Sequence, residues 1–200
     1  MIILVPCKHL NAGKSRLSVC LNDRDRRDLC KRLLDCTLEL ARTLVGLNQI
    51  RVVTADPKAH GVAARHLVST IADTTGELNS ALQGARFQLA QEGLRISTIM
   101  VLPIDLPFAT HESLSEAMGQ PTDIVIAADE EGTGTNLLLL RSAACDFPFR
   151  FGPNSYSRHV SQAQAAGLSV ATLTDWRLAR DIDNPDQYAA WTTSAETDRK

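Results

Sequence analysis

Long apolar runs, metal-binding cysteine pairs and a strong net charge are all missing from this sequence of 200 residues. No segment approaches the roughly 20 consecutive apolar residues that a membrane-spanning helix needs. The apolar start MIILVPC is short and has no basic region before it, unlike a secretory signal peptide. We therefore expect a cytoplasmic protein that does not bind a membrane. The net charge of −2 provides no general attraction to nucleic acid, so any affinity for anions must come from locally placed cations.

The cysteines do not form a recognisable framework. Their number is odd, and no C-x-x-C or paired Cys/His spacing occurs among them, so neither a zinc site nor a set of disulfides is expected. We interpret them as small apolar residues in a reducing compartment. They are Cys7, Cys20, Cys30, Cys36 and Cys145.

Six apolar, β-rich segments alternate with four stretches of helical spacing. This order predicts an α/β fold of three layers with a mainly parallel sheet. No internal repeat or linker interrupts the pattern, so residues 1–191 are expected to form one domain, followed by a flexible polar tail over 192–200. The expected strands are 2–5, 50–55, 97–104, 123–128, 136–140 and 168–173, and the expected helices are 23–45, 57–67, 78–93 and 155–167.

Charged residues follow most of the predicted strands, and ligands of parallel α/β sheets bind beyond the carboxyl ends of the strands. A group of cations beside unpaired carboxylates suits a magnesium–nucleotide complex, because the cations neutralise phosphates and the carboxylates hold a hard ion. For any single aspartate, a role as a helix or turn cap is the competing interpretation. The cations are Lys8, Lys14 and Arg16, and the carboxylates are Asp56, Asp105, Asp129, Asp181 and Asp183.

Three of these carboxylates form the predicted metal site. Asp105, in LPIDLP, and Asp183 are the first pair. Asp181 is the third candidate, because residues two apart in an extended segment project to the same side. Nearby prolines stiffen both segments, which fixes the carboxylates at low entropic cost or simply makes turns.

Two glycine-rich and hydroxyl-rich stretches, GTGTN at 132–136 and FGPNSYSRH at 151–159, add a second kind of group. Their glycines allow the backbone to approach a ligand closely. Ser155 stands where a helix should begin, so its hydroxyl either meets an anion or caps the helix. His159, one turn later, either faces the same anion or is packed inside the protein.

A Gly-Lys-Ser triplet at 13–15 raises the question of a phosphate-binding P-loop. The P-loop pattern requires another glycine five residues before the second one, and Lys8 stands there instead. Lysine lacks the freedom of glycine at positive φ, so the loop is not a P-loop.

Six motifs, in this order and at these separations, resemble the CofC/FbiD family of guanylyltransferases, which act in the biosynthesis of the deazaflavin coenzyme F-420. The resemblance covers residues 2 to about 188, and it implies a Rossmann-like fold of the nucleotide-diphospho-sugar-transferase type, formed by a single nucleotidyltransferase domain. The motifs are PCKHLNAGKSRL, ELNSAL, LPIDLPF, EGTGTN, FGPNSYSRH and DIDNPDQ.

The resemblance implies transfer of GMP from GTP to the phosphate of 2-phospho-L-lactate, phosphoenolpyruvate or 3-phospho-D-glycerate, with release of pyrophosphate. Hand-over of the product to an F-420 transferase is expected, and a homodimer is left open. The roles implied are catalysis by Lys8, Lys14 and Arg16; magnesium binding by Asp105, Asp181 and Asp183; phosphoacid binding by Thr135, Gly152 and Ser155; and nucleotide binding by Gly13, Gly76, Leu78, Asn79 and Pro103.

Two other functions stay open at this point. One is a related nucleotidyltransferase that acts on molybdopterin or a sugar phosphate, which would share the magnesium carboxylates. The other is an α/β domain that binds a nucleotide without turnover. The hydroxyl-rich GTGTN and FGPNS stretches favour the phosphoacid guanylyltransferase over the first alternative.

Overall fold

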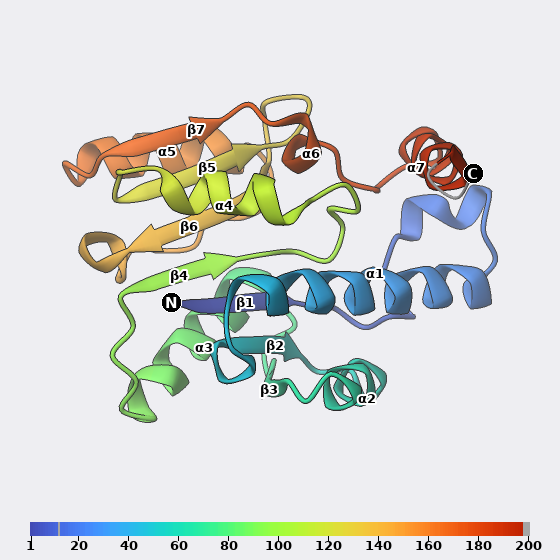
Figure 1. Cartoon of the computed structure of the whole chain (residues 1–200), viewed down its shortest axis with the longest axis horizontal. Helices are drawn as coiled ribbons and strands as arrows, with labels where there is room; N and C mark the ends of the chain where they lie inside the picture. The colour runs from blue at the N-terminus through green and yellow to red at the C-terminus, as the bar shows by residue number, and fades with distance from the viewer. Residues whose placement is uncertain (12, 198–200) are drawn as a thin grey trace.

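A seven-stranded sheet forms the centre of the computed structural model, which describes residues 1–11 and 13–197 (Figure 1). The strand order is β3-β2-β1-β4-β6-β5-β7, and β6 alone among these strands is antiparallel to its neighbours, β4 and β5. The predicted α/β fold with a mainly parallel sheet is thus confirmed. The strands are β1 (Ile2–Pro6), β2 (Ile50–Thr54), β3 (Ser69–Ala72), β4 (Thr98–Val101), β5 (Ile124–Ala128), β6 (Thr135–Arg141) and β7 (Val170–Leu173).

Helices cover both faces of the sheet because its strands are apolar on both sides. In β1, Ile3 and Val5 belong to one buried cluster, and Ile2 and Leu4 belong to the other. On the first face lie α1 (Asp23–Leu44), α2 (Pro57–Arg65), α4 (His111–Gly119) and α6 (Trp176–Ala179). On the second face lie α3 (Leu78–Gln91) and α5 (Ser155–Ala165).

The last helix, α7 (Pro185–Thr197), stands apart from the sheet, beside the segment that joins β1 to α1 (Figure 1). A separate apolar cluster attaches it there: Trp191 is buried against Leu17 and Ile182, and the guanidinium of Arg32 lies 4.7 Å from the centre of the Trp191 ring. This contact connects the opening loop to the acidic segment at 181–183.

All six predicted strands and all four predicted helices are present, whereas β3, α4, α6 and α7 were not predicted. Strand β3 could not be recognised from the apolar pattern, because it lies at the edge of the sheet and has only one buried residue, Ile71. The short helices α4 and α6 were not expected either. Residues 192–197, expected in a flexible tail, continue α7 beyond the anchored Trp191, and 198–200 lie outside the described range.

The topology creates a crevice at one edge of the sheet. After β1 the chain forms β2 and β3 on one side of it, whereas β4 lies on the other side, so the strand order reverses at the boundary between β1 and β4. Ligands of open α/β sheets bind at such a point. Because β6 is antiparallel, its first residue, Thr135, pairs with Ala128 at the end of β5 and lies at this same edge. Within the described chain, no helix is long and apolar enough to span a membrane.

Candidate active site

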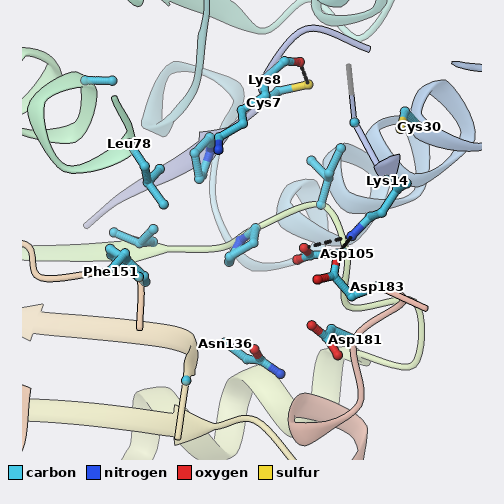
Figure 2. A pocket seen from close by; sticks show the side chains of 18 of the residues that line it. Cys7, Lys8, Lys14, Cys30, Leu78, Asp105, Asn136, Phe151, Asp181 and Asp183 are labelled. Atoms are coloured by element: carbon cyan, nitrogen blue, oxygen red, sulfur yellow. Dashed lines mark hydrogen bonds and ion pairs between the residues drawn. The ribbon is translucent and has the colours of Figure 1, made fainter. Parts of the chain in front are cut away.

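A cavity of about 600 Å³ opens at this edge, between the two halves of the sheet. That volume is typical of sites for nucleotides and other small molecules. The loop after β1, the turn after β3 and the start of α3 line one half. The segment after β4, the start of β6, the start of α5 and the acidic segment after α6 line the other half. Figure 2 shows the acidic side chains at one end of the cavity and Leu78 and Phe151 at the other.

Asp105, Asp181 and Asp183 lie together, with one oxygen from each within 4.8 Å of the others. The backbone brings them together, because the Ile182 N–H donates to the Asp105 carbonyl oxygen at 3.0 Å. Ile182 is completely buried, so the two aspartates that flank it point to the other side of the extended segment, toward the cavity. Burial, and then the charges of Asp105 and Asp183, raise the pKa of Asp181 to about 6. Such a set of carboxylates fits a hard divalent cation.

Lys14 reaches into this acidic cluster from the opening loop (Figure 2). Its ammonium lies 3.0 Å from Asp105 and 3.3 Å from Asp183, and only 7% of the side chain is exposed. Burial lowers the pKa of the ammonium, but the two carboxylates outweigh this effect and raise the pKa above its ordinary value. Arg16, which is exposed, pairs with Asp183 at 3.2 Å. Both residues, expected to contact GTP phosphates, thus pair with the predicted metal ligands here.

The third predicted cation differs from the other two. Lys8 is exposed and lines the cavity, and its ammonium has no ion pair among the described residues. It is therefore available to an anionic ligand.

Gly13 allows the opening loop to pass close to α1. A Cβ at this position would lie 2.8 Å from the sulfur of Cys30, which is closer than real Cβ contacts. Only glycine fits there without displacing a neighbour, and this close packing places the next residue, Lys14, at the acidic cluster.

Two of the carboxylates that follow the strands, Asp56 and Asp129, have structural roles. Asp56 caps α2 by accepting from the Lys58 N–H at 2.9 Å, and it also accepts from the Leu10 N–H at 2.7 Å. Asp129 accepts from the backbone N–H groups of Thr133 and Gly134, at 2.7 and 2.8 Å, and so shapes the turn before β6. For these two residues, the capping interpretation is the correct one.

Thr135, Gly152 and Ser155 lie at the cavity wall between β6 and α5. Thr135 Oγ1 lies 3.0 Å from His159 Nδ1. Ser155 is buried and does not cap its helix, because Asn154 is the capping residue and makes no side-chain cap bond. No hydrogen bond of the Ser155 hydroxyl is found among residues 1–11 and 13–197, so it is available to a ligand in the cavity. Gly152 adopts a φ of +115°, a conformation that favours glycine.

Four of the five predicted nucleotide-binding residues line the cavity, namely Gly13, Gly76, Leu78 and Pro103. The fifth, Asn79, uses its side chain elsewhere. Its amide nitrogen donates to the Phe151 carbonyl at 3.0 Å, and its amide oxygen accepts from the Phe151 N–H at 2.8 Å. Asn79 therefore joins α3 to the loop before α5.

Asp73 and Asn136 are among the polar residues of the cavity wall that were not predicted as site residues. Asp73 follows β3 and accepts from the Gly76 N–H at 2.9 Å, and recognition of β3 as a strand would have indicated it. Asn136, the last residue of GTGTN, donates to the carbonyls of Leu178 and Ala179 at 3.0 and 2.9 Å. It thereby holds α6 in place just before the acidic segment.

Comparisons with known proteins show what the chain is similar to. A family model described as "Guanylyl transferase CofC like" matches residues 1–191. The chain is 37% identical to phosphoenolpyruvate guanylyltransferase of Chloroflexus aggregans, covering 94% of this chain and 96% of the relative. It is 32% identical to the enzyme of the same name from Rubrobacter xylanophilus, covering 93% and 90%.

Solved structures show the same fold at low identity. A protein described as a nucleotide-diphospho-sugar transferase, from Desulfovibrio desulfuricans G20, matches with a TM-score of 0.71 at 19% identity, over 92% of this chain and 82% of that one. A 4-diphosphocytidyl-2C-methyl-D-erythritol synthase matches with a TM-score of 0.64 at 14% identity, over 94% and 95%. At such identities the likeness concerns the fold alone.

Proposed function

The chain belongs to the CofC family of guanylyltransferases, and we propose that it transfers GMP from GTP to the phosphate of phosphoenolpyruvate, releasing pyrophosphate, in coenzyme F-420 biosynthesis. One observation carries the proposal: a single cavity joins the acidic cluster with its cations to the hydroxyl groups at the start of β6 and α5. Phosphoenolpyruvate is the acceptor named for the similar enzymes.

The proposed reaction needs no general base, because a phosphate monoester is already ionised near neutral pH. An oxygen of the acceptor phosphate attacks the α-phosphorus of GTP. The bond from that phosphorus to the oxygen bridging the α- and β-phosphates breaks, and pyrophosphate leaves with its electron pair. The main barrier is repulsion between two polyanions, so catalysis depends on positioning and charge neutralisation.

Residues of the opening loop and the acidic cluster meet this demand. Asp105, Asp181 and Asp183 would hold Mg²⁺, which supplies positive charge beside the reacting phosphates when bound. Lys14 balances the carboxylates in this structure, and we propose that it turns to the GTP phosphates together with Arg16. Lys8, which has no ion pair among the described residues, completes the cationic side.

Each half of the cavity would bind one of the two substrates. Gly13, Gly76, Leu78 and Pro103 would border the nucleotide, with Asn79 acting through the Phe151 backbone. Thr135, Gly152 and Ser155 would bind the phosphoacid, because two hydroxyl-bearing residues and a glycine line the cavity there.

The test measures pyrophosphate release with GTP, Mg²⁺ and each of phosphoenolpyruvate, 2-phospho-L-lactate and 3-phospho-D-glycerate, with an F-420 transferase added to draw off the product. ATP and CTP replace GTP as controls. We expect turnover with phosphoenolpyruvate and GTP. Preference for another phosphoacid would identify that compound as the acceptor. Absence of pyrophosphate release with all three would refute the proposed reaction.

A further inference from the structure

His159 is a fully buried titratable residue beside the proposed acceptor site, and the reaction above gives it no role. It lies on α5, one turn after Ser155. The ring of Phe151 packs edge-on against the imidazole at a centroid distance of 5.3 Å, and the ring of Phe147 lies at 6.0 Å. An ionisable ring in such surroundings requires a partner for each nitrogen.

Both ring nitrogens have one. Nε2 lies 3.0 Å from the backbone nitrogen of Arg150, and Nδ1 lies 3.0 Å from Thr135 Oγ1. A backbone N–H can only donate, so Nε2 must accept. A neutral imidazole carries its hydrogen on the other nitrogen, so Nδ1 donates to the Thr135 hydroxyl. Burial, and then the charges of Arg158 and Arg150, lower the pKa of His159 to about 4, which keeps the ring neutral near pH 7.

This arrangement determines the direction of the Thr135 hydroxyl. Its oxygen accepts from His159, so its single hydrogen is left for another acceptor. Throughout the described part of the chain, Thr135 Oγ1 has no other hydrogen bond, and the residue lines the cavity beside Ser155 and Gly152. A phosphate or carboxylate oxygen, which only accepts at neutral pH, is the matching partner.

We propose that His159 is a positioning residue that fixes the Thr135 hydroxyl as a hydrogen-bond donor toward the oxygens of the phosphoacid. The inference rests on the proposed function, because it takes the hydroxyl-lined half of the cavity as the acceptor site. Through its bond to the Arg150 N–H, the same ring also holds the loop that leads to Gly152.

A double-mutant cycle separates the two effects of His159. His159→Phe keeps an aromatic ring among the phenylalanines and loses both hydrogen bonds, and Thr135→Val loses only the hydroxyl. Each variant should raise the KM for phosphoenolpyruvate by about 10-fold and leave the KM for GTP nearly unchanged. If His159 acts through Thr135, the double variant should resemble the single ones. Effects that multiply would show that His159 acts only through the loop and would overturn the proposal.

His60 provides a matched control, because its Nδ1 lies 2.7 Å from the hydroxyl of Thr70 and it does not line the cavity. His60→Phe should leave both KM values unchanged. A comparable rise in the KM for phosphoenolpyruvate in this variant would mean that loss of any histidine–threonine pair disturbs the protein, and would remove the support for His159.

Two measurements do not depend on turnover, and the first of them needs no variant. In the wild-type protein, ¹⁵N NMR of the imidazole should show the hydrogen on Nδ1 of His159, and a hydrogen on Nε2 would overturn the proposal. Calorimetry should show binding of phosphoenolpyruvate that Thr135→Val weakens. Binding without turnover would refute only the proposed reaction, whereas absence of binding would overturn the role of His159 together with the acceptor site.

Discussion

Replacing Lys14 by methionine tests how the acidic cluster is held together in the absence of a metal ion. The ammonium balances Asp105 and Asp183, and its side chain is only 7% exposed, against 31% and 44% for the two carboxylates. Removing one partner of a buried ion pair costs about 3–5 kcal/mol. Since both carboxylates are partly solvated, we expect a smaller loss, about 2 kcal/mol.

Thermal unfolding measures this effect. For a protein of this size, 2 kcal/mol corresponds to a fall in Tm of about 4–8 °C. With the competing ammonium gone, millimolar Mg²⁺ should raise the Tm of Lys14→Met more than that of the wild-type protein, because the ion stabilises the folded state that binds it. Arg16→Met is the matched control: Arg16 also pairs with Asp183 but is 75% exposed, so its loss should shift the Tm by no more than about 1–2 °C. Equal shifts for the two variants, or a Lys14→Met protein whose Tm does not respond to Mg²⁺, would show that Lys14 does not balance the acidic cluster.

Four further predictions follow from the site. Asp105→Asn should abolish turnover while the protein keeps its fold by circular dichroism, and an active variant would remove Asp105 from the metal site. Ser155→Ala should raise the KM for the phosphoacid more than the KM for GTP, and the reverse order would remove Ser155 from the acceptor site. The pKa of His159 is about 4 in the folded protein and 6.5 in the unfolded protein. Between these pH values the unfolded state therefore binds a proton that the folded state does not bind. The contribution of His159 to stability, about 3 kcal/mol, is complete above pH 6.5 and is lost as the pH falls toward 4. Denaturation at a series of pH values should show this loss in the wild-type protein and not in His159→Phe, and an identical pH dependence would contradict it. Gly13→Ala should destabilise the protein by about 1–3 kcal/mol, because the added Cβ meets the Cys30 sulfur. In chemical denaturation, adding Cys30→Ala to this variant should restore most of the lost stability. If it restores none, the clash with Cys30 is not the cause.

The fold class and the order of most elements could be predicted from the amino-acid sequence alone. Alternating apolar strands and amphipathic helices recur along the chain, and both patterns arise from local backbone geometry, which a sequence carries directly. The motifs also indicated the family and the groups available for chemistry, because cations and carboxylates after strands must gather at one edge of a parallel sheet. The edge strand β3 was not predicted, since a half-exposed strand of four residues has almost no apolar pattern.

The way in which those groups pair depends on tertiary contacts and could not be predicted. Asp56, Asp105 and Asp129 all follow strands, yet Asp105 joins the acidic cluster while the other two bond to backbone N–H groups. Lys14 meets partners 91 and 169 residues away along the chain, and the hydrogen on His159 depends on a backbone N–H from a different segment. Short-range charge balance and hydrogen bonding select among chemically equivalent side chains, and they act only on groups that folding has brought within about 3–4 Å of each other.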